Sequence, residues 1–156
     1  MTQTPIIKKV AVLSVVGGST LLDIEDYEYF KQWRWFKHSS GYIQRAKKIN
    51  GSWKTIRLHL EILKPELGKQ TDHINRDRTD NRRCNLRAVT ASQNAHNRRI
   101  RTNNTSGVMG VWYRKETKKW TARITVEGKR KVLGCFSSML DAAQAYKDAK
   151  ELYVRY

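Results

Sequence analysis

The chain is poor in cysteine and has no long apolar run. Cys84 and Cys135 are the only cysteines among 156 residues, so neither a disulfide scaffold nor a four-cysteine zinc site is available, and no structural zinc is expected. No apolar stretch approaches the roughly 20 residues of a membrane span, and the start, MTQTPIIKKV, lacks the apolar region of a signal peptide. We therefore expect a globular protein without a membrane partner, located in the cytoplasm.

Acidic residues are also scarce. Fourteen Asp and Glu face 31 Lys and Arg, which gives a formal net charge of +17. A polyanion is the expected partner at this charge density, and nucleic acid is favoured over a membrane surface because no basic amphipathic helix with a broad apolar face stands out. A basic protein with no such partner is the less favoured alternative.

Composition divides the chain into three modules and one linker, and the mixture of patterns predicts the α+β class. Residues 1–57 read as a small strand-rich unit. It contains a strand in IIKKVAVLSVV, a helix that begins after Asp23, and a hairpin whose turn is Asn50-Gly51. Nothing in this unit suggests chemistry, and DNA clamping or scaffolding are the roles considered for it.

Residues 58–98 are predicted to run strand, polar loop, strand and helix. The strands are KQTDHI and LRAVT, and Thr90 or Ser92 is placed to cap a helix from Gln93 to about Ile100. The basic and then polar residues 99–107 are typical of a linker. This linker is either an arm that lies along phosphates or a solvated tether, and the composition fits both.

Residues 108–156 predict a three-stranded antiparallel sheet packed on one helix. Glu127-Gly128 provides a hairpin turn, after a strand in which polar and apolar residues alternate. Ser138 and Asp141 have the spacing of a capping box. The residues that then recur at helical spacing are Leu140, Ala143, Tyr146 and Ala149.

Asp72-His73 is the pair that suggests chemistry. Phosphodiester hydrolysis needs a base to take a proton from water and a cation to neutralise charge on the phosphate. A carboxylate is a hard oxygen ligand suited to Mg²⁺ or Mn²⁺, and a neutral imidazole is a suitable base. Taken alone, however, an Asp-His pair is more often a surface or capping pair.

The residues that follow give the pair its significance. Asn85, twelve positions after His73, starts the second strand, where its carboxamide can pin the loop and hold the imidazole. Asn94 falls on the helix and can be a second oxygen ligand. His96 is rotated by about 200° from Asn94 on a helix, which makes it the poorer ligand candidate. Because adjacent strand residues face opposite sides, we expect irregular backbone at the Asp-His pair.

The segment TDHINRDRTDNRRCNLRAVTASQNAHN resembles the ββα-metal site of HNH endonucleases, most closely the phage homing type. The resemblance implies that His73 is the general base, that Asp72 and Asn94 hold one divalent metal ion, Mg²⁺ or Mn²⁺, and that Asn85 orients the site. It also implies products with a 5′-phosphate and a 3′-hydroxyl. Asn stands where the family name has its final His, and a carboxamide is a weaker ligand. His59 is interpreted as structural in preference to catalytic.

The segment from Ser106 to Tyr153 resembles the APETALA-two/ethylene-response-factor DNA-binding domain. The shared features are Ser-Gly-x-x-Gly-Val, Lys-Trp-x-Ala-x-Ile, Leu-Gly-x-Phe and Asp-Ala-Ala-x-Ala-Tyr. The resemblance implies that the sheet enters the major groove. For Trp120, core packing is an equally good interpretation. With Arg98 from the preceding module, the DNA-binding candidates are Trp112, Arg114, Lys115, Trp120, Arg123, Arg130 and Lys131.

Together these patterns predict a metal-dependent HNH endonuclease of the homing type that hydrolyses double-stranded DNA, with the cytoplasm of a bacterial host as its location if a phage encodes it. The alternative from another class is a DNA-binding regulator or architectural protein that does not cut. An RNA-binding protein is a third and weaker hypothesis. The sequence predicts a monomer or a DNA-bound homodimer and does not choose between nicking and double-strand cleavage.

Overall fold

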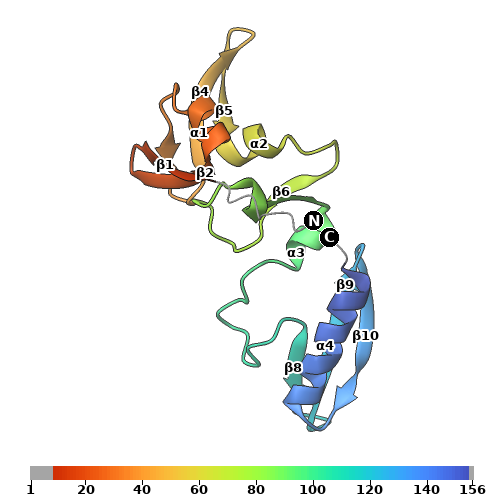
Figure 1. The fold of residues 1–156 in the computed structure, drawn as a ribbon. Coiled ribbons are helices and arrows are strands. Elements are labelled where there is room, and N and C mark those ends of the chain that lie inside the picture. Colours follow the sequence, from red (N-terminus) through yellow and green to blue (C-terminus); the bar gives the residue numbers. More distant parts are fainter. Residues whose placement is uncertain (1–8, 155–156) are drawn as a thin grey trace, which may run out of the picture. The chain divides into compact units, whose positions relative to one another are not determined.

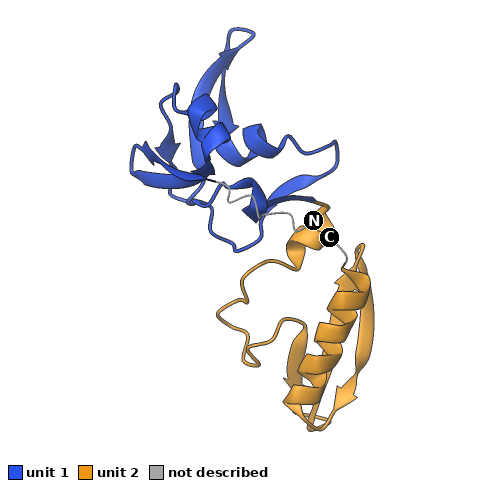
Figure 2. Cartoon of the chain, in the orientation of Figure 1, with its two compact units in different colours: residues 1–88 blue, residues 89–156 orange. Residues whose placement is uncertain are grey.

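The computed structural model describes residues 9–154. They form two compact units, which are the described parts of residues 1–88 and 89–156 (Figure 2). Each unit has its own hydrophobic core. The division falls between Ala88 and Val89, inside the expected nuclease module. The functional boundaries drawn from the sequence stay a prediction.

The first unit begins with two small antiparallel sheets (Figure 1). Strands β1 (Val10–Val15) and β2 (Gly18–Asp23) form one, and β3 (Phe36–Lys37), β4 (Ile43–Ile49) and β5 (Ser52–Arg57) form the other. The Asn50-Gly51 hairpin is confirmed, since both residues have positive φ, 49° and 79°, as a tight β4–β5 turn requires. The predicted first strand included residues 6–8, which lie outside the described residues.

Two short helices complete the core of this unit. Helix α1 (Ile24–Phe30) follows β2, and α2 (Leu58–Leu63) follows β5. Phe30 and Leu58 are buried with Trp35, whose Nε1 donates to the Phe30 carbonyl at 3.0 Å. Asp23 precedes α1, as predicted, but its carboxylate does not cap the helix and instead accepts a bond from the backbone N–H of Arg83.

The third sheet of the first unit carries the Asp-His pair. Strand β6 (Gln70–His73) pairs with β7 (Leu86–Val89), and a polar loop of residues 74–85 joins them, ending in a short 3₁₀ helix (Arg83–Asn85). The predicted order of strand, polar loop and strand is therefore confirmed. Val89, the last residue of β7, is counted with the second unit.

The second unit contains α3 (Ala91–Ala95), β8 (Val111–Arg114), β9 (Lys119–Val126), β10 (Lys129–Phe136) and α4 (Met139–Tyr153). The sheet order is β10-β9-β8, all antiparallel, with α4 packed on one face (Figure 1). The predicted α+β class is confirmed, as are the three-stranded sheet, its single long helix and the Glu127-Gly128 turn. No helix in the described chain has the length and apolar character needed to span a bilayer.

Gly110 shows how closely the second unit is packed. Its φ is +73°, and a Cβ at this position would lie 2.3 Å from the carbonyl oxygen of Arg123 and 2.5 Å from the Tyr146 ring. Any side chain here would force the loop before β8 away from the sheet and from α4. Glycine is therefore required where residues 106–110 meet the core.

Three local predictions in this unit are correct only in part. Thr90 caps α3 through a full capping box with Gln93, but the helix ends at Ala95, well before Ile100. Ser138 caps α4 through the N–H of Leu140, without the predicted box. The buried face of α4 consists of Ala142, Tyr146 and Ala149, whereas Leu140 is 73% exposed and Ala143 is half-buried.

Candidate active site

The loop of residues 74–85 is fastened to the amino-terminal segment of the same unit. The N–H of Leu21 donates to the Thr79 carbonyl and the N–H of Asn81 to the Leu21 carbonyl, both at 2.9 Å. Arg83 donates two bonds to the carboxylate of Asp26, at 2.8 and 2.7 Å. Asp26 is buried, so this pair anchors the end of the loop to α1. Residues 1–57 therefore include a scaffold for this loop.

Asn85 closes the loop from inside. Its Oδ1 accepts a bond from the N–H of Asn75 at 3.0 Å, and its Nδ2 donates to Asn75 Oδ1 and to the Asp80 carbonyl at 2.9 and 2.8 Å. Only a carboxamide can accept and donate in this way, since a carboxylate has no donor. Asn85 therefore fastens the loop through Asn75 and Asp80, and its role in holding the imidazole stays a prediction.

The imidazole of His73 is held by Asn81. His73 Nε2 lies 3.2 Å from Asn81 Oδ1, and both side chains are buried. Asn81 Nδ2 donates to Thr20 Oγ1 at 2.8 Å and to the Arg78 carbonyl at 3.2 Å. Thr20 donates in turn to the Thr79 carbonyl at 2.7 Å. A chain of hydrogen bonds thus runs from β2 to the ring.

This chain determines which ring nitrogen carries the proton. The Arg78 carbonyl can only accept, so the Asn81 atom facing it is the amide nitrogen, and the atom facing His73 is the oxygen. Nε2 must therefore be the donor, and in the neutral ring the lone pair lies on Nδ1. Burial lowers the pKa of His73 below its ordinary value, more than the Asn81 bond and the Asp72 charge raise it. The neutral, proton-accepting ring is thereby favoured.

Asp72 precedes His73 and has a different partner. Nε and Nη2 of Arg87, on β7, both donate to its Oδ2, at 2.9 and 2.8 Å. The Asp72 side chain is 9% exposed, so the pair is largely removed from water. β6 is a regular strand through Asp72 and ends at His73, where a turn begins with the N–H of Arg76 bonded to the His73 carbonyl, so the expected irregularity is confined to the end of the strand.

His59 lies against the other side of the His73 ring. The two ring centroids are 5.2 Å apart in an edge-to-face arrangement, and the Tyr42 ring lies 4.9 Å from His59. His59 is 4% exposed, and its Nδ1 has no hydrogen-bond partner among the described residues. Burial first, and then the charges of His73, Arg57 and Arg78, lower the pKa of His59 to about 3. His59 therefore packs as a neutral ring.

Two arginines lie beside the ring of Tyr42, which packs against His59. The guanidinium carbons of Arg78 and Arg57 lie 4.3 and 5.1 Å from the centre of the Tyr42 ring. Arg78 also donates to the Ser40 carbonyl. Cation–π contacts and this bond hold positive charge beside His73, where a phosphate can be neutralised.

The two residues proposed from the helix, Asn94 and the less favoured His96, belong to the second unit. The N–H of Asn94 donates to the Thr90 carbonyl within α3. His96 is buried, with Nε2 2.8 Å from the Thr125 carbonyl and Nδ1 3.3 Å from the Tyr146 hydroxyl. Both ring nitrogens of His96 are engaged within the second unit, which disfavours it as a metal ligand. The ligand role of Asn94 rests on its place in the sequence motif.

The DNA-binding candidates of the second unit divide between the two faces of its sheet. Strand pairing places Trp112 opposite Thr121 and Arg130 opposite Thr125, on the face turned away from α4. Arg123 lies on the same face, with its guanidinium carbon 5.0 Å from the centre of the Trp112 ring. Arg114, two positions after Trp112, completes this outer group.

The other candidates lie elsewhere. Trp120 packs against the core of the second unit, with its ring centroid 5.2 Å from that of Tyr113 and the two ring planes tilted, which favours the core-packing interpretation. Lys131 Nζ lies 3.9 Å from the centre of the Tyr153 ring, on the α4 side. Lys115 is exposed in the turn after β8, and Arg98 is exposed beyond the end of α3.

The sequence interpretation missed Asn81 and Arg87. Each lies in a motif that carried the resemblance, Asp-Asn-Arg for Asn81 and Asn-Leu-Arg for Arg87. The motifs therefore contained both residues, but a linear sequence pattern does not show which asparagine of the loop has its side chain directed toward the histidine. Asn81 is completely buried, which no polar, turn-rich stretch would suggest.

Comparison with known proteins shows which family this region resembles. Residues 65–96 match the HNH endonuclease family, and the matched stretch contains Asp72, His73, Asn81, Asn85 and Asn94. Protein 3.8 of Escherichia phage T7 is 26% identical over 115 residues, which covers 70% of this chain and 95% of that protein. No solved structure gives a significant match.

The matched stretch contains the whole of β6, the pinned loop and β7. It supports a function of the nuclease type, with nucleic acid as the substrate, and HNH endonucleases generally use a divalent metal ion. The residues that hold His73 in place lie within this stretch, with Thr20 added from the amino-terminal scaffold. The chain is therefore similar, over its candidate active site, to HNH endonucleases.

Proposed function

We propose that the chain is a divalent-metal-dependent endonuclease that hydrolyses the phosphodiester bonds of double-stranded DNA. The observation that carries the proposal is the arrangement of His73 within the stretch that matches HNH endonucleases. His73 is buried and its neutral form is favoured. Asn81 bonds its Nε2, which leaves Nδ1 as the proton acceptor. A base with an assigned acceptor atom is the first requirement for activating water.

In the proposed reaction, His73 Nδ1 takes a proton from a water molecule. The water oxygen attacks phosphorus, and the bond between phosphorus and the 3′-oxygen breaks. That oxygen takes up a proton, so the products carry a 5′-phosphate and a 3′-hydroxyl. Asn81 keeps the imidazole oriented while it becomes positively charged, and Asn85 maintains the loop that presents Asn81.

The donor chemistry fits one hard divalent cation. Asp72 offers a carboxylate and Asn94 a carboxamide oxygen, and Mg²⁺ is commonly held by one or two such groups together with water and substrate phosphate. When bound, the cation, Mg²⁺ or Mn²⁺, would neutralise charge on the phosphate and on the leaving oxygen. Arg87 fixes the Asp72 carboxylate through Oδ2.

The second unit is proposed to hold the DNA, as its resemblance to the APETALA-two/ethylene-response-factor domain implies. Trp112, Arg114, Arg123 and Arg130 share the sheet face turned away from α4, and a polar strand face with arginines suits a DNA groove. We infer a homing-type enzyme that acts as a monomer or a DNA-bound homodimer.

The proposal is tested by incubating the full chain with supercoiled plasmid and either Mg²⁺ or Mn²⁺. We expect conversion to nicked or linear DNA, abolished by a chelator and restored by excess metal. Gel-shift binding to the same DNA is measured in parallel. Binding without any nicking, under either metal, would favour the alternative of a DNA-binding regulator or architectural protein.

The RNA-binding alternative is tested with competitors. Duplex DNA should displace a labelled duplex more effectively than an equal amount of single-stranded RNA does. A clear preference for RNA would overturn the choice of substrate, even if the nuclease chemistry were correct.

A further inference from the structure

The basic segment that follows α3 is a folded part of the second unit. Asn104 Oδ1 accepts bonds from the N–H groups of Ser106 and Gly107 at 3.0 and 2.8 Å, and its Nδ2 donates to the Val108 carbonyl. Ser106 is buried and its hydroxyl lies 2.6 Å from the Val111 carbonyl at the start of β8. The loop of residues 102–110 is thereby tied to the sheet and has a defined shape.

The beginning of the segment is tied down as well. The side chain of His96 bonds the Thr125 carbonyl, and Lys150 Nζ donates to the His96 carbonyl at 3.3 Å. On α3, Ser92 Oγ accepts a bond from the N–H of Glu127 at 3.1 Å. The chain between His96 and Asn104 is thus fixed at both ends on the same unit.

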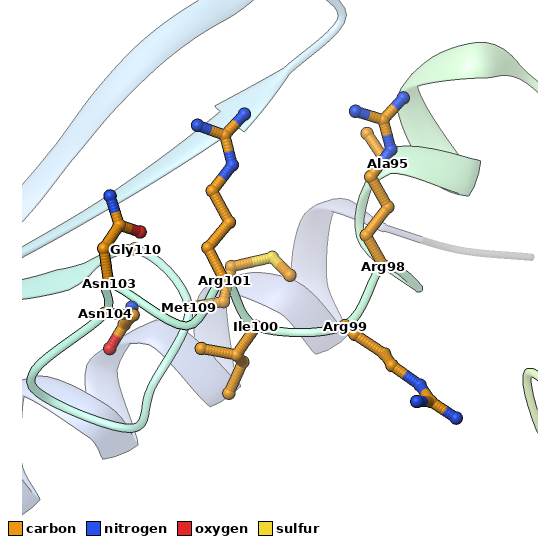
Figure 3. Close-up of a pocket in the computed structure, with 9 residues that line it drawn as sticks. All are labelled: Ala95, Arg98, Arg99, Ile100, Arg101, Asn103, Asn104, Met109 and Gly110. Atoms are coloured by element: carbon orange, nitrogen blue, oxygen red, sulfur yellow. The ribbon is translucent and has the colours of Figure 1, made fainter.

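A pocket of about 350 Å³ lies along this segment (Figure 3). Its walls are residues of α3, the basic segment and the loop before β8. Met109 supplies apolar surface between Arg98 and Arg101, whereas the Ile100 side chain extends to the other side of the segment, and Asn103 adds an amide at one end. The residues that line the pocket are Ala95, Arg98, Arg99, Ile100, Arg101, Asn103, Asn104, Met109 and Gly110.

Two of the three arginines of the pocket point in the same direction. Arg98 and Arg101 extend to the same side of the segment, whereas Arg99 extends to the opposite side (Figure 3). All three are exposed, and within residues 9–154 none of them forms an ion pair with an acidic side chain. Positive charge of this kind, unpaired within the described chain, is available to an external anion.

We propose that this pocket binds one sugar-phosphate unit of the DNA backbone, with the phosphate between Arg98 and Arg101 and the deoxyribose against Met109. The inference rests on the proposed function, because it takes duplex DNA as the ligand of the chain. Arginine is suited to a phosphate by its fork of N–H donors, and the apolar Met109 side chain suits the carbon face of the sugar ring. The segment then positions the DNA without reading its sequence.

The test compares Arg98→Gln and Arg101→Gln with Arg99→Gln in the full chain. Each removes one positive charge from the same exposed segment, and only the first two alter the proposed phosphate contact. Affinity for a short random-sequence duplex is measured by fluorescence anisotropy over a range of salt concentrations. Thermal unfolding of each variant should match wild type, since these side chains are exposed.

We expect Arg98→Gln and Arg101→Gln each to weaken binding several-fold, and the double variant to reduce the slope of log affinity against log salt by about 0.9, the contribution of one phosphate. Arg99→Gln should stay close to wild type. Equal effects of all three substitutions would overturn the proposal, because general charge would then explain them. So would a loss confined to single-stranded RNA binding.

The outcomes separate this inference from the proposed function. If wild type binds duplex DNA and nicks plasmid, but Arg98→Gln and Arg101→Gln behave like Arg99→Gln, the pocket is wrong and the nuclease stands. If wild type binds with the expected arginine dependence and never nicks, the pocket stands and the nuclease proposal fails. If wild type does not bind duplex DNA at all, both are overturned.

Discussion

Asn81 Oδ1 and His73 Nε2 lie 3.2 Å apart, and the two bonds donated by the Asn81 amide nitrogen leave only this orientation of the carboxamide. The loop therefore determines the tautomer of the proposed base. Because Thr20 accepts one of those bonds, a hydrogen bond joins the amino-terminal scaffold to the candidate active site.

Replacing Asn81 should allow the neutral His73 ring to adopt both tautomers. In Asn81→Leu the ring loses its acceptor, and the buried Thr20 hydroxyl loses a donor, so we expect cleavage to fall about tenfold or more and stability by about 1–3 kcal/mol. The ring ¹⁵N shifts of His73, recorded in neutral protein, should move from a pure Nε2–H pattern toward a mixture of tautomers.

Thr20→Val is the control for this effect. It removes a buried partner of Asn81 and leaves the Asn81 oxygen on the histidine, so it should lower stability while the Nε2–H pattern of His73 persists. An unchanged ¹⁵N pattern in Asn81→Leu would contradict the positioning role of Asn81.

Arg87 should hold the Asp72 carboxylate in competition with a cation. Arg87→Met leaves a buried carboxylate without its ion-pair partner, and we expect a loss of about 3 kcal/mol in the free energy of unfolding. If Asp72 is a metal ligand, Mn²⁺ should then raise the melting temperature of this variant more than that of wild type.

The double variant Arg87→Met with Asp72→Asn provides the comparison. It has no carboxylate at this position, so the extra stabilisation by Mn²⁺ should disappear. The same Mn²⁺ shift with and without Asp72 would show that the cation binds elsewhere.

His59 should make the first unit sensitive to acid. Its pKa in the folded protein, about 3, lies below the ordinary value of 6.5, so the unfolded chain takes up a proton that the folded chain does not. The contribution of neutral His59 to the free energy of unfolding is complete above pH 6.5. It is lost as the pH falls toward 3, by about 1.4 kcal/mol for each unit of pH.

His59→Leu should make this acid dependence shallower in urea unfolding experiments monitored by tryptophan fluorescence. The matched variant His38→Leu, at an exposed position, serves as the control. An acid dependence as steep in His59→Leu as in wild type would show that His59 does not remain neutral in the fold.

The two faces of the carboxyl-terminal sheet should differ in DNA binding. Arg130 and Lys131 are neighbours in β10, but Arg130 shares the face of Trp112 and Arg123, whereas Lys131 lies over Tyr153 of α4. We expect Arg130→Gln to weaken duplex binding and lower the salt slope by about 1, and Lys131→Gln to change binding less. The reverse order, measured by anisotropy, would place the DNA on the α4 side.

The sequence predicted what depends on local patterns. Asn50-Gly51 and Glu127-Gly128 specify tight turns through positive φ, and the alternation around Ala122 and Ile124 specifies a sheet with one buried face. The order of strand, polar loop and strand around the Asp-His pair followed in the same way.

What it missed depends on contacts between distant segments. Asp23 has the identity and position of a helix cap, yet the Arg83 N–H, far along the chain, takes its carboxylate. His96 follows a helix that ends early, and its ring enters the core beside Tyr146. Asn81 lies in a stretch typical of exposed turns, yet it is fully buried and donates a bond to Thr20. Local propensity cannot report such partners.

The most direct test of the central claim is chemical rescue of the proposed base. His73→Ala should lose cleavage of supercoiled plasmid by several orders of magnitude with either Mg²⁺ or Mn²⁺, while its binding to duplex DNA stays near the wild-type level. Because His73 is buried, the substitution leaves a cavity of about the size of its ring. Added imidazole should restore part of the activity, in proportion to its neutral form. Undiminished cleavage by His73→Ala would contradict the account.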